Sequence, residues 1–296
     1  MAQKTKTAYF RSDALAEALD KATGQATAGD RRHLYDLICR SSWLPGKTAN
    51  MPLMWAFAQE CADRGSKGDA LALAMASLDA DEAPGATELE FLPMCGVATF
   101  AVRALAEPKK RAKYIGLLHE CADDLRFRVR DVVVLCLAKV GEQLGEELVE
   151  ELDGWMDGYF HGTAVLRALA EPGLLAKLTD ADLIITRVDQ AFSLAKNAER
   201  AASRYPGFKA LMEALGSVPA LVASRFGTQV FDMLERWTKE KDPAMRLLVE
   251  KNLDRMRGRF NTDVARVWKA LEATKPARRD PTTYVGRTRG RGRKVR

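Results

Sequence analysis

Basic residues give the strongest chemical signal in this sequence, and they gather at its C-terminal end. Glycine and arginine alternate there, and the cations are Arg287, Arg289, Arg291, Arg293, Lys294 and Arg296. The stretch has no apolar periodicity, so we expect residues 275–296 to be a disordered polycation that follows phosphates without reading a base sequence. A solubilising tail that contacts acidic surfaces, including residues 142–182 of the same chain, accounts for the composition equally well.

Two further groups of cations occur at helical spacing within the body of the chain. The first is spaced by four residues along a predicted helix over 180–204 and consists of Lys196, Arg200 and Arg204. The second lies on a predicted helix over 243–256 and includes Arg246, Lys251 and Arg255. We expect both groups to contact nucleic-acid phosphates. The first group is also explained by the preference of cations for a helix C-terminus.

The location of the charge matters more than its total. The chain carries a formal net charge of +6. Residues 275–296 hold nine basic residues and Asp280, a net charge of +8, which leaves −2 for residues 1–274. Residues 142–182 are strongly acidic, with ten carboxylates against Arg167 and Lys177. The overall pI near 9.0 is therefore set by the tail and does not by itself indicate that the folded body binds nucleic acid.

Residue types used in catalysis and metal binding are sparse and scattered. The histidines His33, His119 and His161 lie far apart in the sequence, with no cysteine or histidine at ligand spacing. Five cysteines form no C-x-x-C pair, so we expect reduced, buried thiols: Cys39, Cys61, Cys95, Cys121 and Cys136. No nucleophile elbow, glycine-rich nucleotide turn or H-E-x-x-H motif is present. The sequence thus predicts no metal site, no cofactor and no identifiable catalytic residue.

A repeated phrase indicates which elements must position the basic residues. Arg103–Pro108 reads RALAEP and returns 64 residues later as Arg167–Pro172, each time closing an apolar run at a proline. Proline lacks an N–H and restricts the preceding residue, so a helix is expected to end at each copy. A second phrase, ECAD, occurs at Glu60–Asp63 and Glu120–Asp123. Recurring helical units are typical of an array in which each unit buries its apolar face against its neighbours.

The composition favours helices throughout the body of the chain. Hydrophobic residues make up 47% and aromatic residues 7% of the 296 residues. We expect an all-α fold in three parts: a polar N-terminal arm (1–11), a helical-repeat domain (12–274) and the basic tail (275–296). Residues 126–140 should form an inner helix covered on more than one side. The five tryptophans are expected to pack in the core and not to stack on bases. No signal peptide or membrane span is evident, which predicts a cytoplasmic protein.

Two turn-and-helix stretches, 124–137 and 242–253, resemble HEAT repeats. In that family an aspartate in the turn and an arginine early in the second helix stack between neighbouring units. The pairs Asp124 with Arg128, and Asp242 with Arg246, match this spacing. The resemblance implies a right-handed α-solenoid of HEAT-like helical pairs. It says little about function, because such arrays bind proteins, nucleic acids or neither.

One enzymatic branch of these arrays is the AlkD-like HEAT DNA glycosylases, which act in DNA repair on alkylated bases. The resemblance implies a carboxylate beside aromatic side chains that hold the alkylated nucleotide. Trp155 with Asp153 and Asp157, or Trp237 with Asp242, offers such neighbours. No residue-by-residue match to that family's site is found, so no catalytic residue is assigned. The acidic surroundings of Asp153 and Asp157 would also repel a phosphate backbone.

The preferred interpretation is a non-enzymatic binding scaffold whose partner is nucleic acid, DNA in preference to RNA, or a nucleic-acid-associated protein. An AlkD-like DNA glycosylase and a protein-binding adaptor without nucleic-acid contact are the alternatives. None of the three implies a membrane or a small-molecule cofactor.

Overall fold

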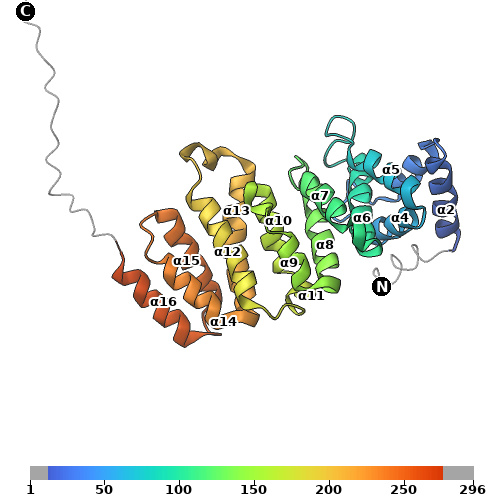
Figure 1. Ribbon diagram of the computed structural model, residues 1–296. Coiled ribbons are helices and arrows are strands. Elements are labelled where there is room, and N and C mark those ends of the chain that lie inside the picture. Colours follow the sequence, from blue (N-terminus) through green and yellow to red (C-terminus); the bar gives the residue numbers. More distant parts are fainter. Residues whose placement is uncertain (1–12, 276–296) are drawn as a thin grey trace, which may run out of the picture.

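The computed structural model describes residues 13–275, and every regular element in that range is a helix (Figure 1). The α-helices are α2 (Asp13–Thr27), α3 (Arg32–Ser41), α4 (Met51–Asp63), α5 (Gly65–Ala76), α6 (Phe91–Ala106), α7 (Arg111–Ala122), α8 (Phe127–Leu144), α9 (Glu146–Glu151), α10 (Tyr159–Leu169), α11 (Pro172–Leu175), α12 (Ala181–Lys196), α13 (Pro206–Leu215), α14 (Val218–Trp237), α15 (Pro243–Met256) and α16 (Asn261–Ala273). The short 3-10 helices are η1 (Glu88–Glu90), η2 (Pro108–Lys110), η3 (Trp155–Asp157) and η4 (Arg200–Arg204). The all-α prediction is confirmed for this part of the chain. The arm over 1–11 and the tail beyond Lys275 lie outside the described residues.

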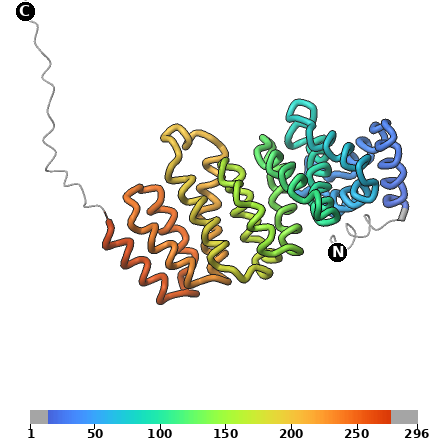
Figure 2. Tube along the Cα trace, in the orientation of Figure 1, coloured from blue at the N-terminus to red at the C-terminus, as the bar shows by residue number. Residues whose placement is uncertain are grey.

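The helices lie side by side in one elongated row (Figures 1 and 2). From α4 onwards, α4, α6, α8, α10, α12, α14 and α16 each pack against the next helix of this series. The intervening helices α5, α7, α13 and α15 pack alongside them. Residues distant in the sequence therefore meet where their helices are neighbours in the row, and this determines which side chains can form a site.

Both copies of the repeated phrase end a helix, as predicted. α6 ends at Ala106, two residues before Pro108, and α10 ends at Leu169, with Pro172 opening α11. The two arginines nevertheless differ in environment. Arg103 is buried and pairs with Asp69 of α5 at 2.6 Å, whereas Arg167 is exposed and pairs with Asp131 at 2.6 Å. The same sequence phrase thus places an arginine in an ion pair between two packed helices at both sites, largely buried at the first and exposed at the second.

One predicted helix boundary is wrong. The helix predicted over 180–204 ends at Lys196, and the chain turns before the short η4 over Arg200–Arg204. α14 begins at Val218 and bends at Phe226, where φ is −120° and ψ is 47°, so it consists of two helical segments. Pro219 occupies the first turn of α14, where its missing N–H would be unpaired in any case. Pro219 therefore begins this helix and does not interrupt it.

The core is deepest around α6 and α8. All five residues of the predicted inner face of α8 are buried: Val129, Val132, Val133, Cys136 and Val140. Residues 88–106 are long and apolar enough to cross a membrane, by length and composition only, which the sequence analysis did not anticipate. Most of this segment is buried inside the protein, against α4, α5, α7 and α8. Its apolar character is accounted for by these helices.

The predicted aspartate–arginine pairs are not formed. Asp124 pairs with Arg126 at 2.6 Å, while Arg128 pairs with the buried Glu90 at 3.0 Å. Asp242 accepts the N–H of Ala244 and caps α15. Arg246 instead donates to backbone carbonyls at the end of α16. The sequence spacing of aspartate and arginine therefore predicted where the turns lie, but not which groups these side chains contact.

Candidate nucleic-acid interface and histidine cluster

A pocket of about 340 Å³ lies where the N-terminal ends of α8, α10 and α13 meet the turn after α7. Its lining residues are Asp123, Leu125, Arg130, Tyr159, Phe160, Tyr205, Pro206 and Gly207. The positive ends of three helix dipoles face this region, an arrangement that favours negatively charged groups. The pocket is therefore a place where an anion and an apolar ring can be held together.

Aromatic and cationic side chains of the pocket are already in contact. The guanidinium of Arg130 lies 4.1 Å from the ring centroid of Phe160. Burial lowers the pKa of Arg130, although Asp124 and other acids oppose this effect. Tyr205 is 60% exposed, so its ring face is open to a ligand. The sequence analysis missed this pocket, and its only local signal is an aromatic residue at the start of two helices, Tyr159 in α10 and Tyr205 before α13.

Two of the three cations in the first predicted group lie on the segment that directly precedes this pocket in the sequence. Lys196 ends α12, and its Nζ pairs with Glu240 at 2.8 Å. Arg200 and Arg204 are exposed on η4 and form no ion pair within the described part of the chain. Arg204 precedes Tyr205 in the sequence. The two arginines are thus available to an anionic ligand.

The second predicted group is divided between the interior and a distant surface. Arg246 is 8% exposed and donates to the carbonyl of Leu271 at 2.7 Å and to the hydroxyl of Thr274 at 2.9 Å. Arg255 donates to the carbonyl of Gly216 at 3.0 Å, and Lys251 lies against the same glycine. Gly216 follows the last residue of α13. The pocket lined by Tyr205, called the Tyr205 pocket below, lies at the start of the same helix, about 15 Å away along ten residues. Arg246 is structural, and the predicted cations do not form one continuous surface.

The tail cations Arg287, Arg289, Arg291, Arg293, Lys294 and Arg296 lie outside the described residues. Their predicted contact with nucleic acid stays a prediction from sequence.

The tryptophan–carboxylate pairs suggested by the glycosylase resemblance are occupied by other contacts. Trp155 and Trp237 are buried, and the indole N–H of Trp237 donates to Asp189 at 2.6 Å. Asp153 pairs with the buried Arg187, and Asp242 caps α15. Neither tryptophan exposes a face on which a base could stack. Asp123 is a carboxylate that lines the Tyr205 pocket together with aromatic side chains.

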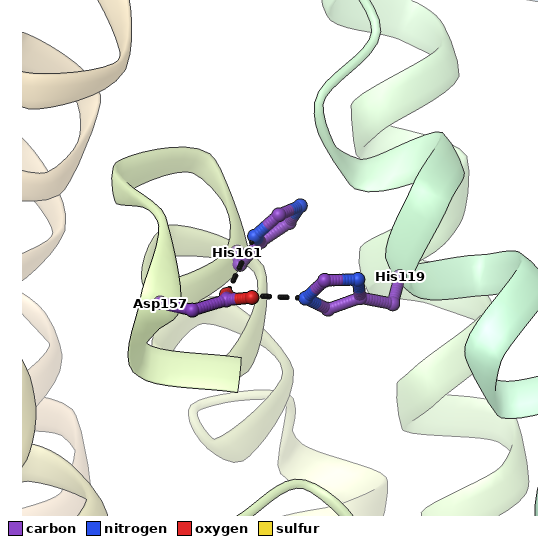
Figure 3. Close-up of side chains that lie close together, drawn as sticks. All are labelled: His119, Asp157 and His161. Atoms are coloured by element: carbon purple, nitrogen blue, oxygen red, sulfur yellow. Dashed lines mark hydrogen bonds and ion pairs between the residues drawn. The ribbon is translucent and has the colours of Figure 1, made fainter. Parts of the chain in front are cut away.

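A second group of chemically active side chains lies between α7 and α10. His119 of α7 and His161 of α10 are 42 residues apart in the sequence, but their ring centroids are 3.8 Å apart. Figure 3 shows both rings directed at one carboxylate, Asp157. Its Oδ1 lies 3.1 Å from Nε2 of His119 and 2.8 Å from Nδ1 of His161. Their separation along the chain did not indicate this contact.

The surroundings hold the cluster of His119, Asp157 and His161 in place. The edge of Trp155 packs on His119 with ring centroids 5.0 Å apart. Gly158 leaves room for His161, because a Cβ at this position would lie 2.6 Å from Nδ1. Partial burial would raise the pKa of Asp157, but hydrogen bonds from His119 and His161 outweigh it and lower the pKa. The only local sequence signal was the four-residue spacing of Asp157 and His161, since His119 comes from another helical pair.

Comparison with protein-family profiles, curated proteins and solved structures gave no match.

Proposed function

We propose that this protein is a non-enzymatic scaffold, a right-handed α-solenoid of HEAT-like helical pairs, that binds nucleic acid at the Tyr205 pocket. The succession of α4, α6, α8, α10, α12, α14 and α16 along one row supports the solenoid part of this proposal. The functional part is supported by one observation. The exposed Arg200 and Arg204 lie on the segment directly before Tyr205, and Tyr205 lines a pocket together with Tyr159 and Phe160.

The pocket and its edge offer two complementary contacts to a nucleotide. An unstacked base can lie on the open ring of Tyr205, since stacking on aromatic side chains is worth about 1–3 kcal/mol per base. Arg200, Arg204 and the N-terminal ends of α10 and α13 can receive the adjacent phosphates. The proposed ligand is therefore a nucleic acid with an accessible base, single-stranded DNA in preference to RNA.

The test is fluorescence anisotropy of the full chain with labelled single-stranded DNA, duplex DNA and single-stranded RNA over a range of salt concentrations. Tyr205→Ala should weaken binding to single-stranded DNA by about 5- to 150-fold, the loss of one stacked base, with an unchanged salt slope. Arg200→Gln with Arg204→Gln should reduce the salt slope by about 1.4, because each single-stranded phosphate contact contributes about 0.7.

The matched control is Lys251→Gln with Arg255→Gln, which removes two exposed cations at the other end of α13. This double variant should bind as the unaltered chain does. Equal losses in both double variants would indicate nonspecific charge attraction and would reject the pocket. Absence of binding to all three probes would favour the protein-binding adaptor.

A DNA glycosylase is the second candidate, because Asp123 lines the pocket together with Tyr159, Phe160 and Tyr205. A carboxylate there could stabilise the positive charge that develops as a glycosidic bond breaks. Release of methylated purines from alkylated DNA, lost in Asp123→Asn without loss of DNA binding, would support the enzyme over the scaffold.

A further inference from the structure

The cluster of His119, Asp157 and His161 contains the donor atoms of a transition-metal site. Two imidazole nitrogens and one carboxylate oxygen suit Zn²⁺ and neighbouring ions, whereas Ca²⁺ and Mg²⁺ prefer oxygen ligands alone. The three candidate ligand atoms all lie within 4.8 Å of one another. From this arrangement we propose that His119 Nε2, His161 Nδ1 and the Asp157 carboxylate bind one divalent ion of the zinc class. This inference does not depend on the proposed nucleic-acid binding.

The distances are close to those that coordination requires. Zinc bonds of about 2.0–2.1 Å at tetrahedral angles place ligand atoms about 3.3 Å apart. Asp157 Oδ1 lies 3.1 Å from His119 Nε2 and 2.8 Å from His161 Nδ1, so each of these two pairs needs to move apart by only a few tenths of an ångström, and the two imidazole nitrogens lie within 4.8 Å of each other. The two imidazole rings are stacked, with planes 29° apart, and each directs one nitrogen at Asp157. Coordination would rotate one ring out of this stack to make the lone pairs converge.

Exposure of the three side chains gives an ion a route to the site. The Asp157 side chain is 54% exposed, compared with 27% for His119 and 14% for His161. An ion would enter from the aspartate side and retain a water molecule as its fourth ligand, the arrangement of zinc sites with three protein ligands. The histidine side is closed by Trp155, which packs edge-on against His119 and His161.

The backbone beside His161 also fits this proposal. Gly158 precedes α10 in an extended conformation that any residue can adopt, so no positive φ requires glycine here. Its missing side chain matters because a Cβ would come within 2.6 Å of the proposed ligand atom Nδ1. Substitution of Gly158 would thus displace His161 without removing a ligand.

A bound ion would join two units of the row. His119 lies on α7, whereas Asp157 and His161 belong to η3 and α10. Because the ion binds the folded arrangement and not the separated helices, saturation should raise the melting temperature of the chain.

The test uses the untagged full chain, stripped with a chelator and titrated with Zn²⁺ by isothermal calorimetry. One equivalent should bind. His119→Gln and Asp157→Asn should weaken binding by at least about 100-fold, and Gly158→Ala by about 10-fold or more. His33→Gln is the matched control, since His33 is exposed and lies on α3, away from the cluster. It should bind Zn²⁺ with the affinity of the unaltered chain and show the same rise in melting temperature.

Two measurements keep the proposal open to rejection if a variant fails to fold. The chain has three histidines, so NMR of the unaltered protein should show Zn²⁺ shifting the ring signals of His119 and His161 but not those of His33. With Co²⁺ in place of zinc, visible bands should appear without a thiolate charge-transfer band. No Zn²⁺ binding, equal binding by His119→Gln and Asp157→Asn, a response of His33 alone, or a thiolate band would overturn the assignment.

Discussion

Arg126 and Asp124 form a two-point ion pair at the turn between α7 and α8, with Nε–Oδ1 and Nη2–Oδ2 distances of 2.9 and 2.6 Å. The same buried guanidinium reaches the loop between α5 and η1. It donates to the carbonyls of Leu78, Asp79 and Ala83 at 2.7, 3.0 and 2.8 Å. One side chain therefore satisfies a carboxylate on its own turn and three carbonyls of the preceding unit.

Replacing Arg126 with methionine should lower the free energy of unfolding by about 3–5 kcal/mol. The substitution keeps side-chain volume but leaves the partly buried Asp124 carboxylate without its partner and several carbonyls without a donor. Chemical denaturation followed by circular dichroism measures the loss. Arg40→Met is the control, because Arg40 and its partner Asp36 are largely exposed, and its effect should stay within about 0.5 kcal/mol. Equal effects in the two variants would contradict the role given to Arg126.

The HEAT resemblance predicted the turn at Asp124 correctly but assigned it the wrong arginine. Arg126, Arg128 and Arg130 follow within six residues of the aspartate, and sequence spacing cannot say which of them faces the preceding unit. The choice is made by the extended backbone of Arg126, with φ of −82° and ψ of 123°, which precedes the first helical residue of α8. Helix periodicity does not apply at that position, so the pairing could not be read from it.

Gly96→Ala should destabilise the protein by several kcal/mol, although alanine is the better helix former. A Cβ on Gly96 of α6 would lie 2.5 Å from both the carbonyl oxygen of Ala72 and the N–H nitrogen of Ala76 in α5. Backbone atoms cannot move aside as a flexible side chain can, so α5 and α6 would have to separate. Thermal unfolding measures the effect.

The control for this prediction is Gly116→Ala in α7. Nothing lies within 4 Å of a Cβ at that exposed position. Alanine there should raise the free energy of unfolding by about 0.5–1 kcal/mol, since only the backbone entropy cost changes. If both glycine variants shift stability in the same direction, the close approach of α5 and α6 is not the reason for Gly96.

The two candidate sites could not be predicted from the sequence, because each is formed by residues that are far apart in the chain. Apolar periodicity and proline positions predicted the helices of α7, α8 and α10, and most of their cores, because these signals are local. His119 meets His161 only because α7 and α10 are neighbours in the row. The Tyr205 pocket likewise needs three helix starts that are far apart in the sequence. Arg246 was read as a surface cation although it caps the end of α16, since helical spacing does not reveal which face a neighbour will cover.

Glu146 should contribute stability that disappears in acid. Its carboxylate accepts the backbone N–H of Thr179, the Thr179 hydroxyl and the N–H of Asp180, which lowers its pKa from 4.5 to about 2. A depressed folded-state pKa means that the contribution is complete above about pH 4.5 and is lost as pH falls towards 2. Because Glu146 is only partly buried, this contribution to the free energy of unfolding should be only about 1 kcal/mol.

Denaturation of the unaltered chain and of Glu146→Gln between pH 7 and pH 2 measures this contribution. The difference in unfolding free energy should be constant at neutral pH and shrink below pH 4.5. Glu150→Gln, an exposed position on the same helix α9, should show no such pH-dependent difference. A Glu146→Gln difference that grows towards low pH would have the wrong sign for a depressed pKa.

The C-terminal cations should supply most of the nonspecific affinity for nucleic acid. Residues 275–296 carry a net charge of +8 and residues 1–274 carry −2. Engagement of six tail cations with duplex DNA should give a salt slope of about 5, at roughly 0.9 for each phosphate neutralised. Deleting residues 276–296 should therefore flatten the salt dependence and weaken binding by orders of magnitude at low salt.

The deletion begins after Lys275 because Arg246 donates to the carbonyl and hydroxyl of Thr274, so an earlier end would disturb the last helix. With that contact kept, the melting temperature should change little. A truncated chain with unchanged affinity and slope would place the binding energy on the helical row itself, with the Tyr205 pocket as its first candidate.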